Sequence, residues 1–180
     1  MRKRELQELS QKQRFRPSDE ASTFKIIKSV KELVAATIPL LDSMQEEWLV
    51  VVPGLATVVA SLFGINDAAA ALIQRGGNVR TLVDISYPII DNVQELLNIG
   101  EEVRHTDQRG VMFVVFDWKH SMTNINPPGS ASLNAPMAAL WTDDPMYALY
   151  LASTFEMLWK LSVPAEERIQ ELLEQGPPQV

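Results

Sequence analysis

The sequence predicts an α/β fold with a mostly parallel central sheet sandwiched by helices. Short runs of β-branched and aromatic residues alternate along the chain with longer segments of helical periodicity. These runs are continuously apolar, which is typical of strands buried on both faces. With 180 residues, 46% of them hydrophobic, the chain is long enough for one domain with its own core.

The first part of the chain is predicted to be an N-terminal helix followed by a strand and a second helix. The N-terminal helix is expected over residues 18–43, with Ser18 as its N-cap. A β-favouring run at residues 48–52 predicts a buried strand. The next helix is expected over residues 55–75, and Gly64 is expected to divide it into two pieces.

The rest of the chain continues the alternation of strands and helices. Residues 126–136 contain three prolines and one glycine without periodicity, so they predict a loop. The other expected elements are a strand at 78–84, a helix from Ser86 to Gly100, strands at 102–105 and 111–116, a hairpin arm at 118–125, a strand at 137–141, a helix from Asp144 to about Val163 and a short helix from Pro164.

The chain is expected to consist of a basic flexible tail at residues 1–17, a single α/β domain at 18–173 and a tail at 174–180. The net charge of −7 is unevenly distributed: residues 1–16 hold six basic and two acidic side chains, and the remainder holds 10 basic and 21 acidic ones. An acidic body repels phosphates, so the folded domain is a poor candidate for binding nucleic acid. Only the basic tail is suited to such a contact.

Composition excludes several classes of site. The chain has no cysteine, which excludes disulfides, thiolate metal sites and cysteine nucleophiles, and two histidines are too few for an ordinary zinc site. Glycine-rich phosphate-binding motifs and the Gly-x-Ser-x-Gly motif are absent, so no metal and no cofactor are expected. No apolar run is long enough to span a bilayer and no signal peptide is evident, so a cytoplasmic protein without membrane contact is expected.

The densest polar stretch lies at residues 102–109, where a predicted strand ends just before the strongest one. Ligands usually bind at the ends of strands in α/β folds. Arg104 and His105 are therefore candidates to hold a small anionic or polyhydroxy ligand, together with three residues beyond the next strand: Asp117, Lys119 and Asn124. The alternative is a polar hairpin with a surface histidine.

Two tryptophans are candidates for a wall of the same pocket. Trp118 and Trp141 flank the expected loop at residues 126–136. Aromatic side chains commonly line ligand pockets. Core packing is the alternative role for either one.

Short segments spread over residues 21–170 resemble phospholipase D-like domains. Residues 75–82 (RGGNVRTL) resemble the family's RG-x-VR-x-L segment, and residues 102–117 are similar to its R-H … F-x-V-x-D strand pair. Residues 139–145 and 155–159 resemble the closing strand and helix, in a form familiar from effector domains of TrmB-type archaeal transcription regulators and sensory domains of archaeal histidine kinases. The resemblance implies a phospholipase D-like half-unit. Because family members join two half-units near the active-site edge, it also implies a homodimer.

The sequence departs from the family's catalytic motif. Enzymes of the family use His-x-Lys-x4-Asp, in which the histidine forms a covalent phospho-enzyme and the lysine holds phosphate oxygens. If Asp117 is the motif's aspartate, the histidine position is Gly110 and the lysine position is Met112. Neither side chain can perform its step, and His105 lies five residues too early. The resemblance therefore implies a catalytically inactive domain of the family.

Three functions stay open at this point. The first is a non-enzymatic, ligand-binding sensory or effector domain of a signalling or transcription-regulatory system. The second is a phosphodiesterase-type hydrolase of the same fold with a non-standard site such as His105 and Lys119. The third is a structural or interaction module that binds a partner protein. The missing His–Lys pair weighs against the enzyme, and the polar cluster favours a ligand over a closed scaffold.

Overall fold

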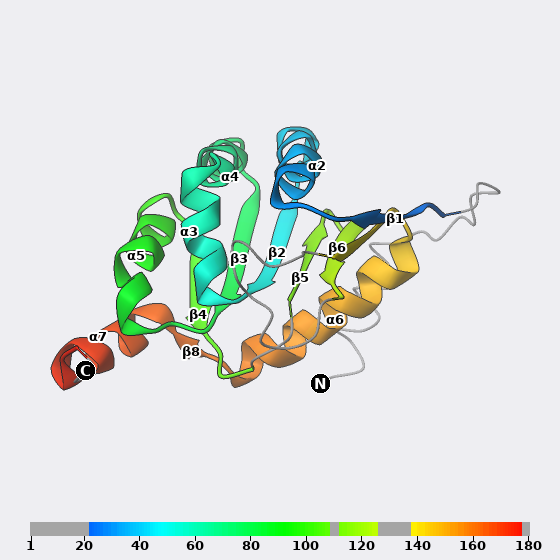
Figure 1. Ribbon diagram of the computed structural model, residues 1–180. Coiled ribbons are helices and arrows are strands. Elements are labelled where there is room, and N and C mark those ends of the chain that lie inside the picture. The colour runs from blue at the N-terminus through cyan, green and yellow to red at the C-terminus, as the bar shows by residue number, and fades with distance from the viewer. Residues whose placement is uncertain (1–21, 109–111, 126–137, 178–180) are drawn as a thin grey trace.

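The computed structural model describes residues 22–108, 112–125 and 138–177 (Figure 1). Its strands are β1 (Phe24–Ile27), β2 (Glu47–Val52), β3 (Asn78–Val83), β4 (Glu102–His105), β5 (Phe113–Phe116), β6 (His120–Asn124), β7 (Ala139–Thr142) and β8 (Val163–Pro164). Its helices are α2 (Val30–Ser43), α3 (Gly54–Leu62), α4 (Ile65–Gln74), α5 (Ile90–Asn98), α6 (Pro145–Leu161) and α7 (Ala165–Gln175), and a 3-10 turn at Tyr87–Ile89 precedes α5.

The strands form one mixed sheet in the order β1-β7-β6-β5-β2-β3-β4-β8. Only the pairs β2–β3 and β3–β4 are parallel. The other five pairs of neighbouring strands are antiparallel. The predicted α/β class is therefore confirmed, but the prediction of a mostly parallel sheet is wrong. Parallel neighbours need a long crossover between them, and helices connect β2 to β3 and β3 to β4 in this way. The helices α2 and α6 instead connect strands that are not neighbours in the sheet.

The predicted N-terminal helix over residues 18–43 is wrong in its first part. Residues up to 21 lie outside the described ranges, and residues 24–27 form the edge strand β1, which pairs with β7. The helix begins only at Val30, and the hydroxyl of Ser29 accepts a hydrogen bond from the Glu32 backbone N–H. The Glu32 carboxylate in turn accepts one from the Lys28 backbone N–H, so both side chains fix the start of α2.

Helices cover the two faces of the sheet unequally, as Figure 1 shows. α2, α3, α4 and α5 lie over one face, and α6 lies across the other. Side chains of β2 alternate accordingly: Trp48 and Val50 pack in the cluster beneath α2 and α4, and Leu49 and Val51 pack with Phe155 and other residues of α6. A third cluster joins α5 and α7 to the β4 edge.

The helix predicted over residues 55–75 is broken where expected. α3 and α4 are separated at Gly64, whose φ of 73° lies in the left-handed region that favours glycine. No single helix among the described residues is long and apolar enough to cross a bilayer. α3 and α4 meet that test only as a pair, and they are bent by 85° at the break between them.

Candidate functional site

A cavity of about 160 Å³ lies between the central strands and the helical layer. Its lining is mostly aliphatic and comes from α2, α3, β2, β5 and β6. Few of the described residues in the lining have polar side chains: Thr37, Trp48, Thr57, Asn66, Thr81, Glu101 and Asn124. An apolar hollow with a few fixed polar groups is the usual form of a small-molecule site.

Glu101 is the one ionisable residue among the described residues that line this cavity. Its side chain is placed by Gly100, which ends the α5 turn with a φ of 97°, and by its own backbone N–H, which donates to the Leu96 carbonyl. The residue is buried, with 6% of its surface exposed, and its carboxylate accepts a 2.8 Å hydrogen bond from the Thr81 hydroxyl. Among the described residues no cation forms an ion pair with it.

Burial determines the protonation of Glu101. Removal from water raises the pKa of the carboxyl to about 7, and the hydrogen bond from Thr81 opposes this shift only in part. Below neutral pH the group is therefore a carboxylic acid, which can donate one hydrogen bond and accept others. Above neutral pH it becomes an anion without a paired cation.

Trp48 also lines the cavity. The residue is only 6% exposed, and its ring stacks on Phe116 at 5.8 Å between centroids. Its indole Nε1 is fully buried and has no hydrogen-bond partner among the described residues. A buried donor without an acceptor costs free energy, on the order of 1–3 kcal/mol.

The other polar groups are mostly held by the protein itself. The Thr57 hydroxyl donates to the Gly54 carbonyl at 2.7 Å, and the Asn66 amide donates to the Glu95 carboxylate at 2.7 Å. The Thr37 hydroxyl lies 4.0 Å from the Met122 sulfur. Among the described lining residues, Glu101 thus carries the ionisable group and Trp48 a buried indole N–H without a partner.

Two of the predicted site residues lie on β4 and are held there by structural contacts. The Arg104 guanidinium donates to the hydroxyl and carbonyl of Ser162 at 2.9 and 2.6 Å and lies over the Trp159 ring. His105 is buried, and its Nδ1 accepts from the Ile85 backbone N–H at 2.9 Å. Its Nε2 lies 3.2 Å from the Asp107 carboxylate.

Three predicted residues form the turn between β5 and β6. Asp117 and Trp118 have φ values of 46° and 60°, and the Lys119 N–H donates to the Phe116 carbonyl, as in a type I′ hairpin turn. The Asp117 carboxylate accepts from the backbone N–H groups of residues 45, 46 and 47 at 2.9–3.0 Å. It therefore ties the turn to the start of β2. Trp118 packs against the cluster beneath α6, and Lys119 is exposed.

The last two predicted residues lie apart from these groups. Trp141 on β7 stacks on His120 at 5.7 Å, and the Lys25 ammonium lies over its ring. Burial lowers the pKa of His120, opposed by the charge of Asp143. Asn124 at the end of β6 lines the cavity, and its backbone N–H donates to the Met112 carbonyl.

The structure does not bring the seven predicted residues together. Asp117 and Lys119 adjoin the start of β2, whereas His105 pairs with Val83 at the opposite end of the parallel strands. Only Asn124 lines the cavity. The alternative catalytic set of His105 and Lys119 is divided in the same way.

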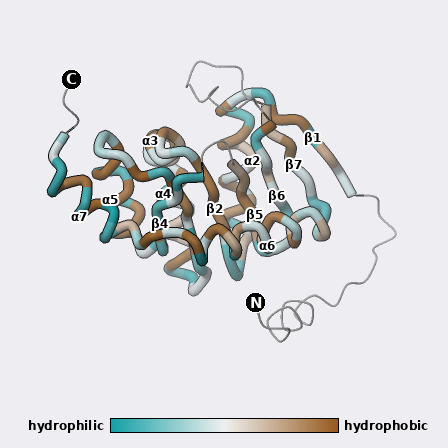
Figure 2. Tube along the Cα trace, turned by 90° about the horizontal axis from the view of Figure 1, so that it is seen from below, coloured by the Kyte–Doolittle hydropathy of each residue, from teal (hydrophilic) through white to brown (hydrophobic). Residues whose placement is uncertain are grey.

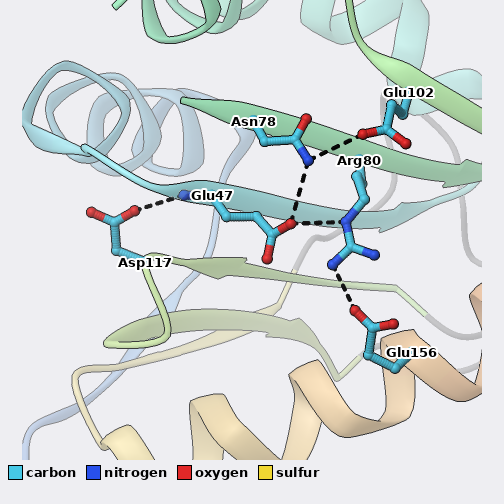
Figure 3. A network of polar contacts seen from close by, with 6 residues as sticks. All are labelled: Glu47, Asn78, Arg80, Glu102, Asp117 and Glu156. Carbon is cyan, nitrogen blue, oxygen red and sulfur yellow. Dashed lines mark hydrogen bonds and ion pairs between the residues drawn. The ribbon is translucent and has the colours of Figure 1, made fainter. Parts of the chain in front are cut away.

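A second polar cluster lies on the α6 face of the sheet (Figure 3). Arg80 of β3 donates to Glu47 at 2.8 Å and to Glu156 of α6 at 2.6 Å, and its guanidinium lies over the Phe155 ring. Burial lowers the pKa of Arg80, but the hydrogen bonds and charges of the two carboxylates outweigh it and raise the pKa. Each charge has a partner, so this cluster joins strands to helix and leaves no charge free for a ligand.

Sequence reasoning missed Glu101, Trp48 and Thr81. Glu101 looks like one of two adjacent surface carboxylates, and Trp48 like an ordinary core residue that opens a strand. One local signal for Glu101 was present: Gly100 ends a helix directly before it, so the next residue turns back toward the sheet. Nothing local shows that Trp48 lacks a hydrogen-bond partner.

The positions of the family's catalytic motif can also be located. Met112, at the lysine position, lines the cavity beside Asn124. Gly110, at the histidine position, lies outside the described residues, as does the expected loop at residues 126–136.

No protein-family model and no curated protein matches the sequence. Among solved structures, the chain is similar to TrmBL2, an archaeal chromatin protein described with a novel mode of DNA binding, with a TM-score of 0.63 and 17% identity over 90% of this chain and 60% of that one. It is similar to Nuc of Salmonella typhimurium, a phospholipase D family member, with a TM-score of 0.62 and 13% identity over 80% of this chain and 98% of that one. NucT from Helicobacter pylori matches with a TM-score of 0.62 and 13% identity, over 80% and 99% of the two chains.

At these identities the likeness shows the fold alone. The chain spans nearly the whole length of the two phospholipase D-like proteins but only 60% of the chromatin protein. The expected phospholipase D-like fold is therefore confirmed.

Proposed function

We propose that this chain is a non-enzymatic sensory domain that binds a small, largely apolar molecule in the cavity between the central strands and the helices. The observation that carries the proposal is the cavity itself, with its aliphatic walls and the buried Glu101 carboxyl. Burying an ionisable group without a cation costs free energy, so a purely structural protein is not expected to keep such a group in its core. A ligand that forms a hydrogen bond with the Glu101 carboxyl would offset part of that cost.

The size of the cavity limits the ligand. A dry apolar cavity of roughly 150 Å³ is large enough for benzene. The 160 Å³ found here therefore suits a molecule with one ring or a short branched chain.

The polar groups define the chemistry of the ligand. A hydroxyl or carbonyl oxygen accepts from the Trp48 Nε1, and a protonated Glu101 offers both a donor and an acceptor. Anions are disfavoured, because Glu101 is acidic and none of the described residues that line the cavity is a cation. The chemistry of the cavity therefore does not support the anionic or polyhydroxy ligand expected from the sequence.

Absence of hydrolysis is part of the proposal. It rests on the sequence, which has glycine and methionine at the two positions where the family's enzymes carry histidine and lysine. Contacts of His105 with Ile85 and Asp107 are those of a structural residue. Turnover of a chromogenic phosphodiester that disappears in the His105→Ala variant would contradict this part.

Binding can be tested by titrating phenol and benzene into the labelled protein while recording the indole N–H signals of its four tryptophans by NMR. The Trp48→Phe variant identifies the Trp48 signal. Phenol should shift that signal and raise the melting temperature, and benzene should do so more weakly because it offers no oxygen. Inorganic phosphate and ribose, which represent the anionic and polyhydroxy classes, should do neither.

A matched pair of variants locates the effect. Ala60→Leu places a larger side chain in the cavity and should abolish the response to phenol. Ala70→Leu changes a half-buried alanine of α4 outside the cavity and should leave it intact. An unchanged Trp48 signal at saturating phenol, or an equal response in Ala60→Leu, would contradict the proposed site.

Contact with DNA is a second candidate, supported by the likeness to a DNA-binding chromatin protein and by the basic residues 1–16. The acidic remainder of the chain argues that any such contact is made by these residues. The full chain should then retard duplex DNA at low salt, and a variant lacking residues 1–16 should not. Equal retardation by both proteins would place the contact on the folded domain and contradict this route.

A further inference from the structure

A groove of about 450 Å³ lies between α5 and α7, at the edge of the sheet formed by β4 and β8. Figure 2 shows the two helices beside each other at the end of the molecule that carries the C-terminus. The described residues that line the groove are Gln94, Leu97, Glu166, Ile169, Gln170, Leu173 and Glu174. We call these residues the α5–α7 groove.

The α5–α7 groove has an apolar floor. Its α7 residues recur at i, i+3, i+4, i+7 and i+8 from Glu166, which places them on one face of the helix. Ile169 is buried and belongs to the core cluster that joins the two helices to β4, whereas Leu173 is 55% exposed. Leu97 of α5 completes the floor. The 11 residues of α7 give the groove a length of about 16 Å.

The two helices that form the groove are strongly acidic. Their charged residues are the six acids Asp91, Glu95, Glu166, Glu167, Glu171 and Glu174 and the single base Arg168. The guanidinium of Arg168 is already engaged, because it lies 3.0 Å from the Glu171 carboxylate. The other five carboxylates have no ion-pair partner in the part of the chain that the structure describes. The groove therefore lies in a surface with an excess of negative charge.

The C-terminal ends of both helices lack the charge that would stabilise them. The C-terminal end of a helix dipole is negative, so lysine or arginine is favourable in the last turn. Neither α5 nor α7 has a basic residue there. Glu174 instead lies in the last turn of α7, where its carboxylate accepts a 2.9 Å hydrogen bond from the Gln170 side chain. A cation supplied from outside the chain would offset this unfavourable charge.

These charges disfavour several occupants of an apolar groove. Nucleic acids and anionic lipid surfaces carry phosphates, which acidic walls repel. A second copy of the chain that docked through the same two helices would place like charges opposite one another. The favoured occupant is therefore a positively charged partner.

The basic residues 1–16 of the same chain have a suitable charge but are too far away. The described part of the chain begins beside β1, and α7 follows β8, which is the opposite edge of the sheet. The seven strand spacings between these edges correspond to about 34 Å. Residues 17–21 span at most about 18 Å, which is too short to bring all of residues 1–16 into the groove.

We propose that the α5–α7 groove binds a basic amphipathic helix of a partner protein. Apolar residues of that helix, spaced at three and four residues, would pack on Leu97, Ile169 and Leu173, as in other complexes of a helix with an apolar groove. Lysines or arginines beside them would face Glu166 and Glu174. None of the groove residues lines the cavity of the proposed ligand, so the two proposals are independent.

Fluorescence anisotropy with the full chain and synthetic peptides tests the chemistry of the partner. The probe is a labelled peptide of about 14 residues, with leucine at every third or fourth position and lysine or alanine elsewhere. This lysine peptide should bind, and its binding should weaken as the salt concentration rises. A control peptide with glutamate in place of each lysine should not bind.

Matched variants test the position of the binding site. Glu166→Lys combined with Glu174→Lys reverses both charges of the groove wall and should weaken binding of the lysine peptide about tenfold or more. Glu167→Lys combined with Glu171→Lys changes the net charge equally on residues outside the groove, and should weaken binding by about threefold at most.

Truncation of the floor tests the apolar part of the interaction. Leu173→Ala should weaken binding of the lysine peptide about fivefold or more, because the exposed leucine loses its contact with the bound helix. All five substituted side chains are exposed, so every variant should keep a melting temperature close to that of the native chain.

Three results would overturn the proposal. One is the absence of binding of the lysine peptide at low salt. Another is an equal loss of affinity in the two double variants, which would indicate a general attraction to the acidic chain. The third is a peptide of residues 1–17 that binds more tightly than the lysine peptide and loses its binding in Leu173→Ala. That result would make the N-terminal segment of another copy the occupant.

Discussion

Replacement of Glu101 by glutamine should remove a component of the pH dependence of stability. Burial raises the pKa of Glu101 in the folded protein from its ordinary value of 4.5 to about 7. Between these values the folded chain retains a proton that the unfolded chain has lost. Stability therefore falls as the pH rises through this range, because the unfolded state binds fewer protons.

The size of the effect follows from the two pKa values. The full difference corresponds to about 3 kcal/mol of unfolding free energy, and about 2 kcal/mol of it falls between pH 5.5 and 8. Glutamine has the shape of the protonated acid and can still accept from Thr81, but it does not titrate. Relative to the native chain, Glu101→Gln should thus gain about 2 kcal/mol of stability between pH 5.5 and pH 8.

Urea unfolding followed by tryptophan fluorescence measures this difference. The series begins at pH 5.5 because the net charge of −7 at neutral pH approaches zero as carboxylates protonate, which promotes aggregation. Glu102→Gln is the matched control, since it removes an exposed carboxylate at the next position. It should leave the pH dependence of the native chain in place. Parallel stability curves for Glu101→Gln and the native chain would refute the assignment of a buried, uncompensated acid.

Two further substitutions test the polar contacts that hold the sheet together. Asp117→Ala should lower the unfolding free energy by about 1–2 kcal/mol, since three backbone N–H groups lose their acceptor. Asp117→Asn should lower it less, because asparagine tolerates the left-handed turn and keeps one acceptor oxygen. Equal losses in the two variants would contradict this account. Arg80→Leu should lower the unfolding free energy by about 2–3 kcal/mol, because Glu47 and Glu156 lose their cation. Adding Glu156→Leu should restore part of this free energy. No recovery would indicate that packing of Arg80 on Phe155 dominates. Urea unfolding measures both.

Local sequence signals were sufficient for most elements of this fold. β2 contains a continuous apolar run, residues 48–52. α6 begins at the predicted Asp144 cap, whose carboxylate accepts from the Tyr147 N–H at 2.8 Å. Gly64 divides α3 from α4 as expected. In each case a short-range rule on burial, capping or backbone freedom is sufficient to specify the element.

Strand direction and the N-terminal strand depend on contacts distant in sequence. Phe24 and Ile27 fit a helical period as well as a strand, and only pairing of β1 with β7 decides between them. Ser29 followed by Glu32 was the better signal for the helix N-terminus. The apolar spacing before Ser29 instead favoured a helix that begins earlier in the chain. The antiparallel majority arises because β5, β6 and β7 lie side by side in alternating directions, which the count of strands alone does not reveal.

The candidate site was the least predictable part. Arg104 and Asp117 are polar residues at strand ends, but both form hydrogen bonds with residues distant in the sequence. Arg104 donates to Ser162, and Asp117 accepts from the backbone N–H groups of residues 45–47. The cavity depends on the spacing between two layers and on the burial of Glu101. Both are properties of the whole packing.

The central claim, that the cavity holds a small ring with one polar oxygen, is tested most directly by crystals grown with 4-bromophenol. Anomalous scattering locates the bromine atom without reference to any model of the ligand. The account predicts one strong peak between β2 and α3, among Val50, Ala60 and Trp48, that is absent in crystals of Ala60→Leu. Bromine found only on the surface, or an unfilled cavity at saturating bromophenol, would contradict it.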